Sequence, residues 1–252
     1  MSAHARLDWL LRCGDNALIL SQRLTEWCGK GPVLEEDMAL ANVALDLMGQ
    51  ARLWLSYAAE VEGKGGDEDS LAFLRDVTAF RNLLLVEQPN GDYADTLMRQ
   101  FFFDCWHYHQ LQSLHSSADT RVAEIAAKSI KEVSYHLRRS GDLVVRLGDG
   151  SDESHRRMQA SADKLWTYSG ETFIDDAMDH AAAANGVAPL PSTLRDAWLA
   201  DVRHVFAEAT LTLPPVDAWM QSGGKQGRHT EHLGYLLAEM QFLQRAYPGA
   251  QW

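Results

Sequence analysis

The sequence predicts an all-α protein, an antiparallel helical bundle with additional helices toward its C-terminal end. The 252 residues include 33 Leu and 32 Ala but 13 Val and 4 Ile. Leu and Ala favour helices, whereas β-branched residues favour strands. Apolar residues also recur at helical spacing in long segments that short turns separate. Four such segments, each of roughly 22 to 30 residues, are long enough to form the bundle.

The first two predicted helices cover residues 7–28 and 35–62. Leu7, Leu11 and Leu18 recur at helical spacing, and Gly-Lys-Gly-Pro at 29–32 ends the first helix. Three acidic residues at 35–37 open the second helix, where the helix dipole favours negative charge.

A short helix is predicted at 71–86 and a third long helix at 93–115. The apolar run at 83–86 is too hydrophobic for an exposed loop, so we expect it to pack inside. Glu-Gln-Pro-Asn-Gly-Asp at 87–92 is a loop, and Asp92 is the expected N-cap of the long helix.

The remaining predicted helices cover 119–147, 152–184 with a kink at Gly170, 193–211 and 230–247, the last capped by Thr230. No linker, internal repeat or low-complexity tract interrupts the chain. We therefore expect one helical domain over residues 1–252.

Charge and composition exclude several classes of function. The formal net charge is −12, and such an acidic surface repels nucleic-acid phosphates. No apolar run approaches the roughly 20 residues that span a bilayer, and the first residues lack the layout of a signal peptide. The cysteines Cys13, Cys28 and Cys105 are widely spaced, which is typical of reduced thiols. We expect a cytoplasmic protein that binds neither nucleic acid nor membrane.

The sequence contains acid–histidine pairs at helical spacing, but not the pair that is typical of di-iron bundles. The Glu-x-x-His pair of di-iron bundles does not occur, although residues at this spacing share a helix face. Acid–histidine pairs at related spacings are Asp104/His107, Asp152/His155, Asp201/His204 and Glu132/His136. Asp104 lies in the aromatic run 101–108, where burying a carboxylate is costly unless it has a partner. It is a candidate for either chemistry or a structural hydrogen bond.

A basic, glycine-rich loop at 223–230 is a second candidate site. Its Lys225, Arg228 and His229 precede a predicted helix N-terminus, which suits an anionic group. We expect these residues to contact a partner protein or the phosphates of coenzyme A, with the partner favoured. The His-Thr-Glu-His run at 229–232 lacks a third ligand and is a poor zinc site.

Several long segments resemble one protein family. They are GDNALILSQRLTEWCG, LANVALDLMGQARLWLSYAAE, NLLLVEQPNGDYADT, KEVSYHLR, DKLW, GGKQGRHTEHL and the terminal PGAQW. The chain resembles the C subunits of the multicomponent ring-1,2-phenylacetyl-CoA epoxidase from about residue 11 to its end. This resemblance implies a ferritin-like bundle.

The resemblance also implies a degenerate metal site. The family's catalytic A subunit is a di-iron paralogue with Ser-Glu, Asp-Glu-x-Gly-His and Lys-Glu-Glu-x-x-His motifs. This chain keeps the frame of each motif, and the corresponding ligand positions are Glu26, Leu47, Gln50, Val133 and His136, with Asp104 expected at the remaining carboxylate position. Two apolar side chains and an amide thus stand where two carboxylates and an imidazole would be. Because two iron ions need several anionic ligands, no metal and no catalytic residue are expected here.

The function implied by the resemblance is structural. The chain would pair with the di-iron A subunit and other subunits of the complex, and electrons would come from NADPH through a flavin and iron–sulfur reductase subunit. Formation of a homodimer by the isolated chain is an additional possibility. Two alternative functions also fit the sequence. One is an acyl-CoA-binding module, and the other is an independent di-metal oxidase that uses Glu26, Asp104, His107, Glu132 and His136.

Overall fold

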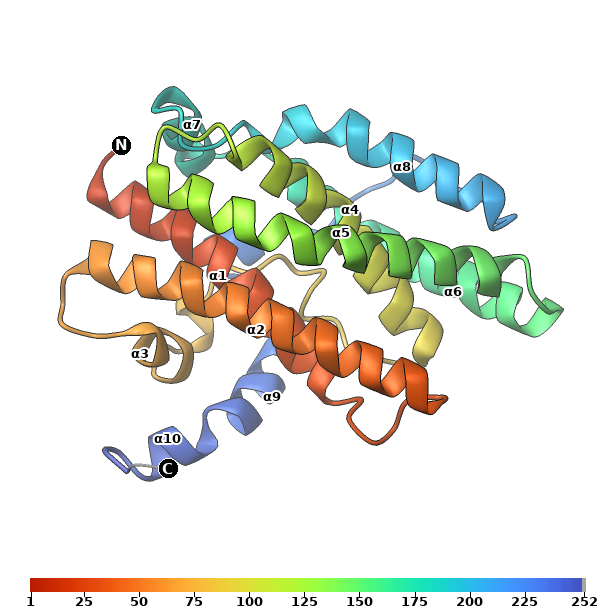
Figure 1. Ribbon diagram of the computed structural model, residues 1–252, viewed down its shortest axis with the longest axis horizontal. Coiled ribbons are helices and arrows are strands. Elements are labelled where there is room, and N and C mark those ends of the chain that lie inside the picture. The colour runs from red at the N-terminus through yellow and green to blue at the C-terminus, as the bar shows by residue number, and fades with distance from the viewer. Residues whose placement is uncertain (251–252) are drawn as a thin grey trace. The chain divides into compact units, whose positions relative to one another are not determined.

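The computed structural model describes residues 1–250 and confirms the all-α class (Figure 1). Gln251 and Trp252, the end of the PGAQW segment, lie outside the described residues. Within the described part every regular element is an α-helix or a 3₁₀ helix. The chain packs into two compact units, one formed by residues 1–89 with the segment from 223 onward and the other by residues 90–222. The single domain over 1–252 stays a prediction.

Two long antiparallel helices, α1 (Ala3–Thr25) and α2 (Leu34–Glu62), form the centre of the first unit (Figure 1). Ser2 caps α1 through a hydrogen bond from the Ala5 amide, and the acidic residues 35–37 occupy the first turn of α2, as predicted. The rings of Trp9 and Trp54 meet edge to face with centroids 6.0 Å apart. Both helices therefore contribute to one apolar core.

The predicted helix at 71–86 is wrong. The helix α3 (Glu68–Phe73) begins earlier because Asp67 and Ser70 form a capping box, and a 3₁₀ turn follows at Val77–Ala79. Residues 82–88 are then irregular yet buried, as expected for so apolar a run. Side chains of α1 satisfy this backbone, since Asn16 Oδ1 accepts from the Leu83 amide (2.8 Å) and Asp15 accepts from the Arg81 amide (2.8 Å). Tertiary hydrogen bonds have replaced the local helical ones.

The C-terminal segment returns to the first unit as a 3₁₀ turn, Gly224–Gln226, and the helices α9 (Glu231–Met240) and α10 (Phe242–Ala246). The predicted single helix 230–247 is thus broken at Gln241. The Gln241 side chain donates to the carbonyls of Ala72 and Arg75, each at 3.0 Å. Thr230 occupies the N-cap position, but its side chain makes no capping hydrogen bond.

The second unit is built on the antiparallel pair α4 (Tyr93–Leu114) and α5 (Thr120–Gly148), followed by α6 (Asp152–Ser169) (Figure 1). Asp92 caps α4 by accepting from the amides of Ala94 and Asp95, which confirms the predicted cap. The predicted kink at Gly170 is a full break. A 3₁₀ turn, Gly170–Phe173, ends α6, and a capping box at Asp176 starts α7 (Ala177–Ala184).

The last helix of this unit, α8 (Arg195–Glu208), follows a 3₁₀ turn at Pro191–Leu194, so the predicted helix 193–211 is shorter at both ends. An aromatic core joins α4, α6 and α8. Trp198 donates its Nε1–H to the Phe102 carbonyl (2.9 Å), and the Trp166 and Trp198 rings lie 5.5 Å apart. Among the described residues, no helix combines the length and apolarity that crossing a membrane requires.

Gly14 on α1 packs closely against Leu55 of α2, which leads to a paired prediction. A Cβ at Gly14 would lie 2.6 Å from Leu55 Cδ2, so Gly14→Ala is expected to lower the free energy of unfolding by about 1–3 kcal/mol. A Cβ at Gly49 meets nothing within 4 Å, so Gly49→Ala should raise it by about 0.5–1 kcal/mol through helix propensity. Urea unfolding measures both values. Equal effects of the two substitutions would contradict the close approach.

Candidate functional site

A buried carboxyl group lies in the middle of α4. Asp104 is fully buried, and both of its oxygens accept hydrogen bonds. Ser140 Oγ donates from α5 to one oxygen at 2.8 Å, and Gln100 Nε2 donates from one turn earlier in α4 to the other at 2.7 Å. The antiparallel pairing of α4 with α5 thus brings together residues 36 positions apart. The carboxyl is the polar group that sequence analysis singled out, and it has the partners that burial demands.

Burial raises the pKa of Asp104 to about 6. The positive charge of His136 and the hydrogen bonds from Ser140 and Gln100 each lower that pKa, but less than burial raises it. All three neighbours favour the ionised form, whereas removing the carboxylate from water disfavours it. The group therefore exchanges its proton close to neutral pH.

His107, one turn further along α4, shifts in the opposite sense. Burial, together with the charge of His136, lowers its pKa to about 3. The imidazole packs against Phe103 with ring centroids 4.9 Å apart, and its Nδ1 is buried without a hydrogen-bond partner. His107 is thus a neutral ring in an apolar site at physiological pH.

Val133 lies on α5 one turn before His136, and both are buried. Within residues 1–250, no group of three or more His, Cys, Asp or Glu side chains is arranged to hold a metal ion. The arrangement can hold and exchange one proton at Asp104, and its other visible role is to fix α4 against α5.

The other three positions of the predicted degenerate site belong to the first unit. Glu26 directly follows α1, forms an ion pair with Arg23 (2.8 Å) and leaves 37% of its side chain exposed. Leu47 and Gln50 lie on α2 and are buried. An apolar residue and an amide therefore occupy the two positions on α2, and the Glu26 carboxylate is paired with the Arg23 guanidinium.

Two of the acid–histidine pairs that spacing suggested have other partners. Asp201 is hydrogen-bonded to His109 between α8 and α4 at 2.7 Å, while His204 lies 3.6 Å from Glu208. His155 contacts the Gly148 carbonyl at 2.8 Å through Nδ1. Sequence reasoning missed the His109–Asp201 pair because 92 residues separate its members.

The loop at 223–230 is tied into the first unit. The His229 side chain is fully buried between Glu87 Oε2 (2.8 Å) and the Phe80 carbonyl (3.1 Å), and Lys225 is also buried. Of the three predicted contact residues, Arg228 presents an exposed side chain. A Cβ at Gly224 would lie 2.2 Å from the Asn82 carbonyl oxygen, so the glycine permits the close approach.

Glu87 is the residue of this region that sequence reasoning missed. Its carboxylate accepts from the Thr230 amide (2.6 Å) and from Asn82 Nδ2 (2.9 Å), besides its contact with His229. The carboxylate therefore takes the place of the Thr230 side chain at the start of α9. In the sequence, Glu87 stands shortly before Pro89, and this pattern predicted a loop but no role for the Glu87 side chain.

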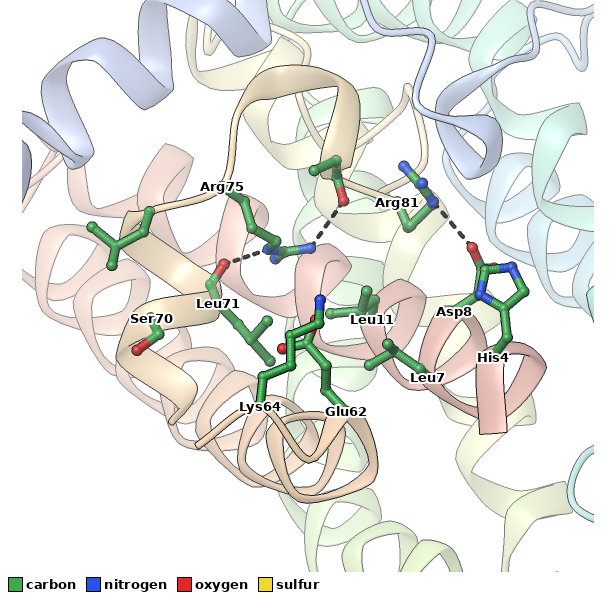
Figure 2. Close-up of a pocket in the computed structure, with 12 residues that line it drawn as sticks. His4, Leu7, Asp8, Leu11, Glu62, Lys64, Ser70, Leu71, Arg75 and Arg81 are labelled. Carbon is green, nitrogen blue, oxygen red and sulfur yellow. Dashed lines mark hydrogen bonds and ion pairs between the residues drawn. The ribbon is translucent and has the colours of Figure 1, made fainter. Parts of the chain in front are cut away.

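A pocket of about 440 Å³ opens beside α1 and α3 (Figure 2). Its cations have anionic partners: Arg75 binds Asp15, Arg81 binds Asp8 at 3.0 Å, and Lys64 binds Glu62 at 2.8 Å. The lining residues are His4, Leu7, Asp8, Leu11, Glu62, Lys64, Ser70, Leu71, Leu74, Arg75, Ala79 and Arg81. Because these ion pairs balance one another, the pocket offers no excess positive charge to an anionic ligand.

Comparison with known proteins decides the family. The model of the family described as "Phenylacetic acid catabolic protein" matches residues 1–252. The chain belongs to this family. It is also 55% identical over 244 residues to the C subunit of the 1,2-phenylacetyl-CoA epoxidase of Escherichia coli K12, a match that covers 97% of this chain and 98% of that protein. The resemblance predicted from the sequence segments is confirmed.

The opposite pKa shifts of Asp104 and His107 predict opposite effects of two substitutions. A raised Asp104 pKa means that the native state holds the extra proton, so its contribution to stability falls as pH rises between about 4 and 6. A lowered His107 pKa means that the unfolded state holds the extra proton, so that contribution falls as pH drops from about 6.5 toward 3.

Relative to the unsubstituted protein, Asp104→Asn should therefore make the free energy of unfolding rise more steeply with pH, and His107→Gln should make it rise less steeply. Each change in slope approaches about 1.4 kcal/mol per pH unit in the shared window. Urea unfolding at several pH values between about 4.5 and 6 measures both slopes. Parallel profiles for all three proteins would contradict the shifts.

Proposed function

We propose that this chain is a structural, non-catalytic subunit of a 1,2-phenylacetyl-CoA epoxidase that acts in phenylacetate catabolism. The observation that carries the proposal is its identity of 55% over 97% of its length to a protein named as the C subunit of that enzyme. The match also covers 98% of that protein, so the likeness extends well beyond a single shared motif. The name "subunit" itself implies partner chains.

The residues at the former ligand positions support a role without metal chemistry. Leu47 and Val133 are buried hydrocarbon side chains, which cannot coordinate iron. The one fully buried carboxyl among the six positions, Asp104, is hydrogen-bonded to two neutral side chains. A di-iron bundle instead needs several carboxylates that converge on one site. The six positions do not provide them.

The partner in this proposal is the di-iron catalytic subunit, which would insert one oxygen atom from O₂ into the aromatic ring of phenylacetyl-CoA. The iron resides on that subunit, and the flavin, iron–sulfur cluster and NADPH reside on the reductase subunit. This chain supplies a rigid helical surface that supports the fold of the catalytic subunit. Cys13, Cys28 and Cys105 are thiols rather than disulfides, which supports a location in the cytoplasm.

The proposal predicts low iron in the isolated chain and a tight complex with the catalytic subunit. The chain is expressed alone in iron-supplemented cells and purified without chelator, and its iron is measured by mass spectrometry. Iron far below one ion per chain is expected. Co-expression with a tagged catalytic subunit should give a stable complex, and the catalytic subunit expressed without this chain is the control, with lower solubility and activity expected.

Three results would count against the proposal. Stoichiometric iron in the isolated chain that Glu26→Ala and His136→Ala abolish would instead support the independent di-metal oxidase. Full activity of the remaining subunits in the absence of this chain would exclude a structural role. Tight binding of phenylacetyl-CoA by the isolated chain, measured by calorimetry, would favour the acyl-CoA-binding module.

A further inference from the structure

A small pocket within the second unit is lined by aromatic rings. Its volume is about 270 Å³, and its walls come from the end of α6, the 3₁₀ turn that follows, the start of α8 and the irregular segment after α8. Trp166, Phe173 and Trp198 line it. The Trp198 ring centroid lies 5.1 Å from that of Phe173 and 5.5 Å from that of Trp166. We call the space beside these three rings the aromatic pocket.

The polar atoms of this wall already have partners outside the pocket. Trp166 Nε1–H donates to the Pro215 carbonyl at 3.0 Å, and Trp198 Nε1–H donates to the Phe102 carbonyl at 2.9 Å. Ser169 Oγ donates to the Trp166 carbonyl at 2.8 Å. The wall therefore offers hydrocarbon and ring surface to a guest. An aromatic ring suits such a wall, because rings pack favourably edge to face or offset.

Arg195 supplies the charge of the aromatic pocket. It is exposed at the start of α8, and none of the residues that line the pocket is acidic. Among the described residues, its side chain has one hydrogen bond, from Nη2 to the Val216 carbonyl at 3.2 Å, and no ion pair. A guanidinium carries five N–H donors in a planar fork that matches a carboxylate. The remaining donors can therefore bind a carboxylate through two parallel hydrogen bonds.

An irregular segment forms one side of the pocket. Residues 209–223, between α8 and the turn at Gly224–Gln226, contain no helix, and Val216 and Met220 from this segment line the pocket. The Gln221 amide donates to the Thr167 carbonyl at 2.7 Å, and Thr167 Oγ1 donates to the Trp219 carbonyl at 3.2 Å. Segments of this length without regular structure are mostly binding loops or linkers. The hydrogen bonds to α6 distinguish this one from a free linker.

Met220 gives this side of the pocket an adaptable surface. A Cβ at Gly170 would lie 2.4 Å from Met220 Cγ, so the methionine packs directly on the glycine. Methionine is unbranched and has three rotatable bonds, which lets it fit irregular shapes. The side chain can therefore adjust to a guest without a change in α6 or α8.

The volume of the pocket limits the size of its guest. Sites for drug-sized ligands measure about 300–1,000 Å³. At about 270 Å³ the aromatic pocket lies just below this range. It suits a single ring with a short side chain.

We propose that the aromatic pocket binds a small aromatic carboxylate, with its ring beside Trp166, Phe173 and Trp198 and its carboxylate on Arg195. This inference goes beyond the proposed function, which assigns no ligand to this chain. It does not depend on that function, because every residue that lines the pocket belongs to the second unit.

The experiment is calorimetric titration of the full chain with two probes that differ in charge. Phenylacetate has one ring and one carboxylate, and phenylacetamide has nearly the same shape without the charge. Phenylacetate should bind with a dissociation constant below about 1 mM. Phenylacetamide should bind at least about tenfold more weakly, because it cannot form charge-assisted hydrogen bonds with the guanidinium.

Three variants locate the site. Arg195→Gln should weaken phenylacetate binding about tenfold. Arg203→Gln is the matched control, because Arg203 is also an exposed arginine of α8 but does not line the pocket, and binding should be unchanged. Val216→Phe enlarges a half-buried side chain of the wall and should abolish binding of both probes. Circular dichroism and thermal unfolding verify that each variant folds.

Four results would overturn the inference. They are no binding of phenylacetate up to about 10 mM, equal affinity for the two probes, equal affinities of the Arg195→Gln and Arg203→Gln variants, and full binding by a folded Val216→Phe variant. The first would leave the chain without a ligand here. The second and third would exclude recognition of the charge by Arg195, and the fourth would place the binding elsewhere.

Discussion

The structure of the first unit depends on hydrogen bonds that α1 provides to a buried, non-helical stretch of backbone. Asp15 accepts from the Arg75 guanidinium and the Arg81 amide, and Asn16 accepts from the Leu83 amide. Arg23 donates to the Glu87 carbonyl. A backbone polar group buried without a partner is costly, so this stretch can lie inside only where α1 presents these side chains. The segment in turn carries Glu87, which accepts from the start of α9.

The same requirement explains why polar residues are so common inside this bundle without converging on a site. Asp15 is paired with a guanidinium, Glu87 with an imidazole and two N–H donors, and Asp104 with a hydroxyl and an amide. Each carboxyl group links elements that are distant in the sequence. Hydrogen bonds of this kind fix the packing of the elements that they join.

The second unit shows how the same burial has opposite consequences for two neighbouring groups. Removal from water disfavours charge, so it raises the pKa of the Asp104 carboxyl and lowers that of the His107 imidazole. Both groups are driven toward neutrality in the aromatic part of α4. At neutral pH the His107 imidazole is uncharged, whereas the Asp104 carboxyl, with a pKa of about 6, still ionises and needs the hydrogen bonds from Ser140 and Gln100.

The sequence by itself determined the all-α class, the starts and ends of the four long helices to within a few residues, the Asp92 cap and the family. These features are local, because helical periodicity, capping residues and glycine–proline breaks act within a turn or two. Only the tertiary structure decided that residues 82–88 are irregular, that α9 and α10 are separated at Gln241 and that His229 is buried against Glu87. Each depends on hydrogen bonds between residues from about 65 to about 170 positions apart, and local propensity carries no information about such partners. Asp104 has one local and one distant partner. Gln100 lies one helical turn away on α4, so its hydrogen bond could be anticipated from the sequence. Ser140 lies on α5, so its hydrogen bond depends on the packing of α4 on α5.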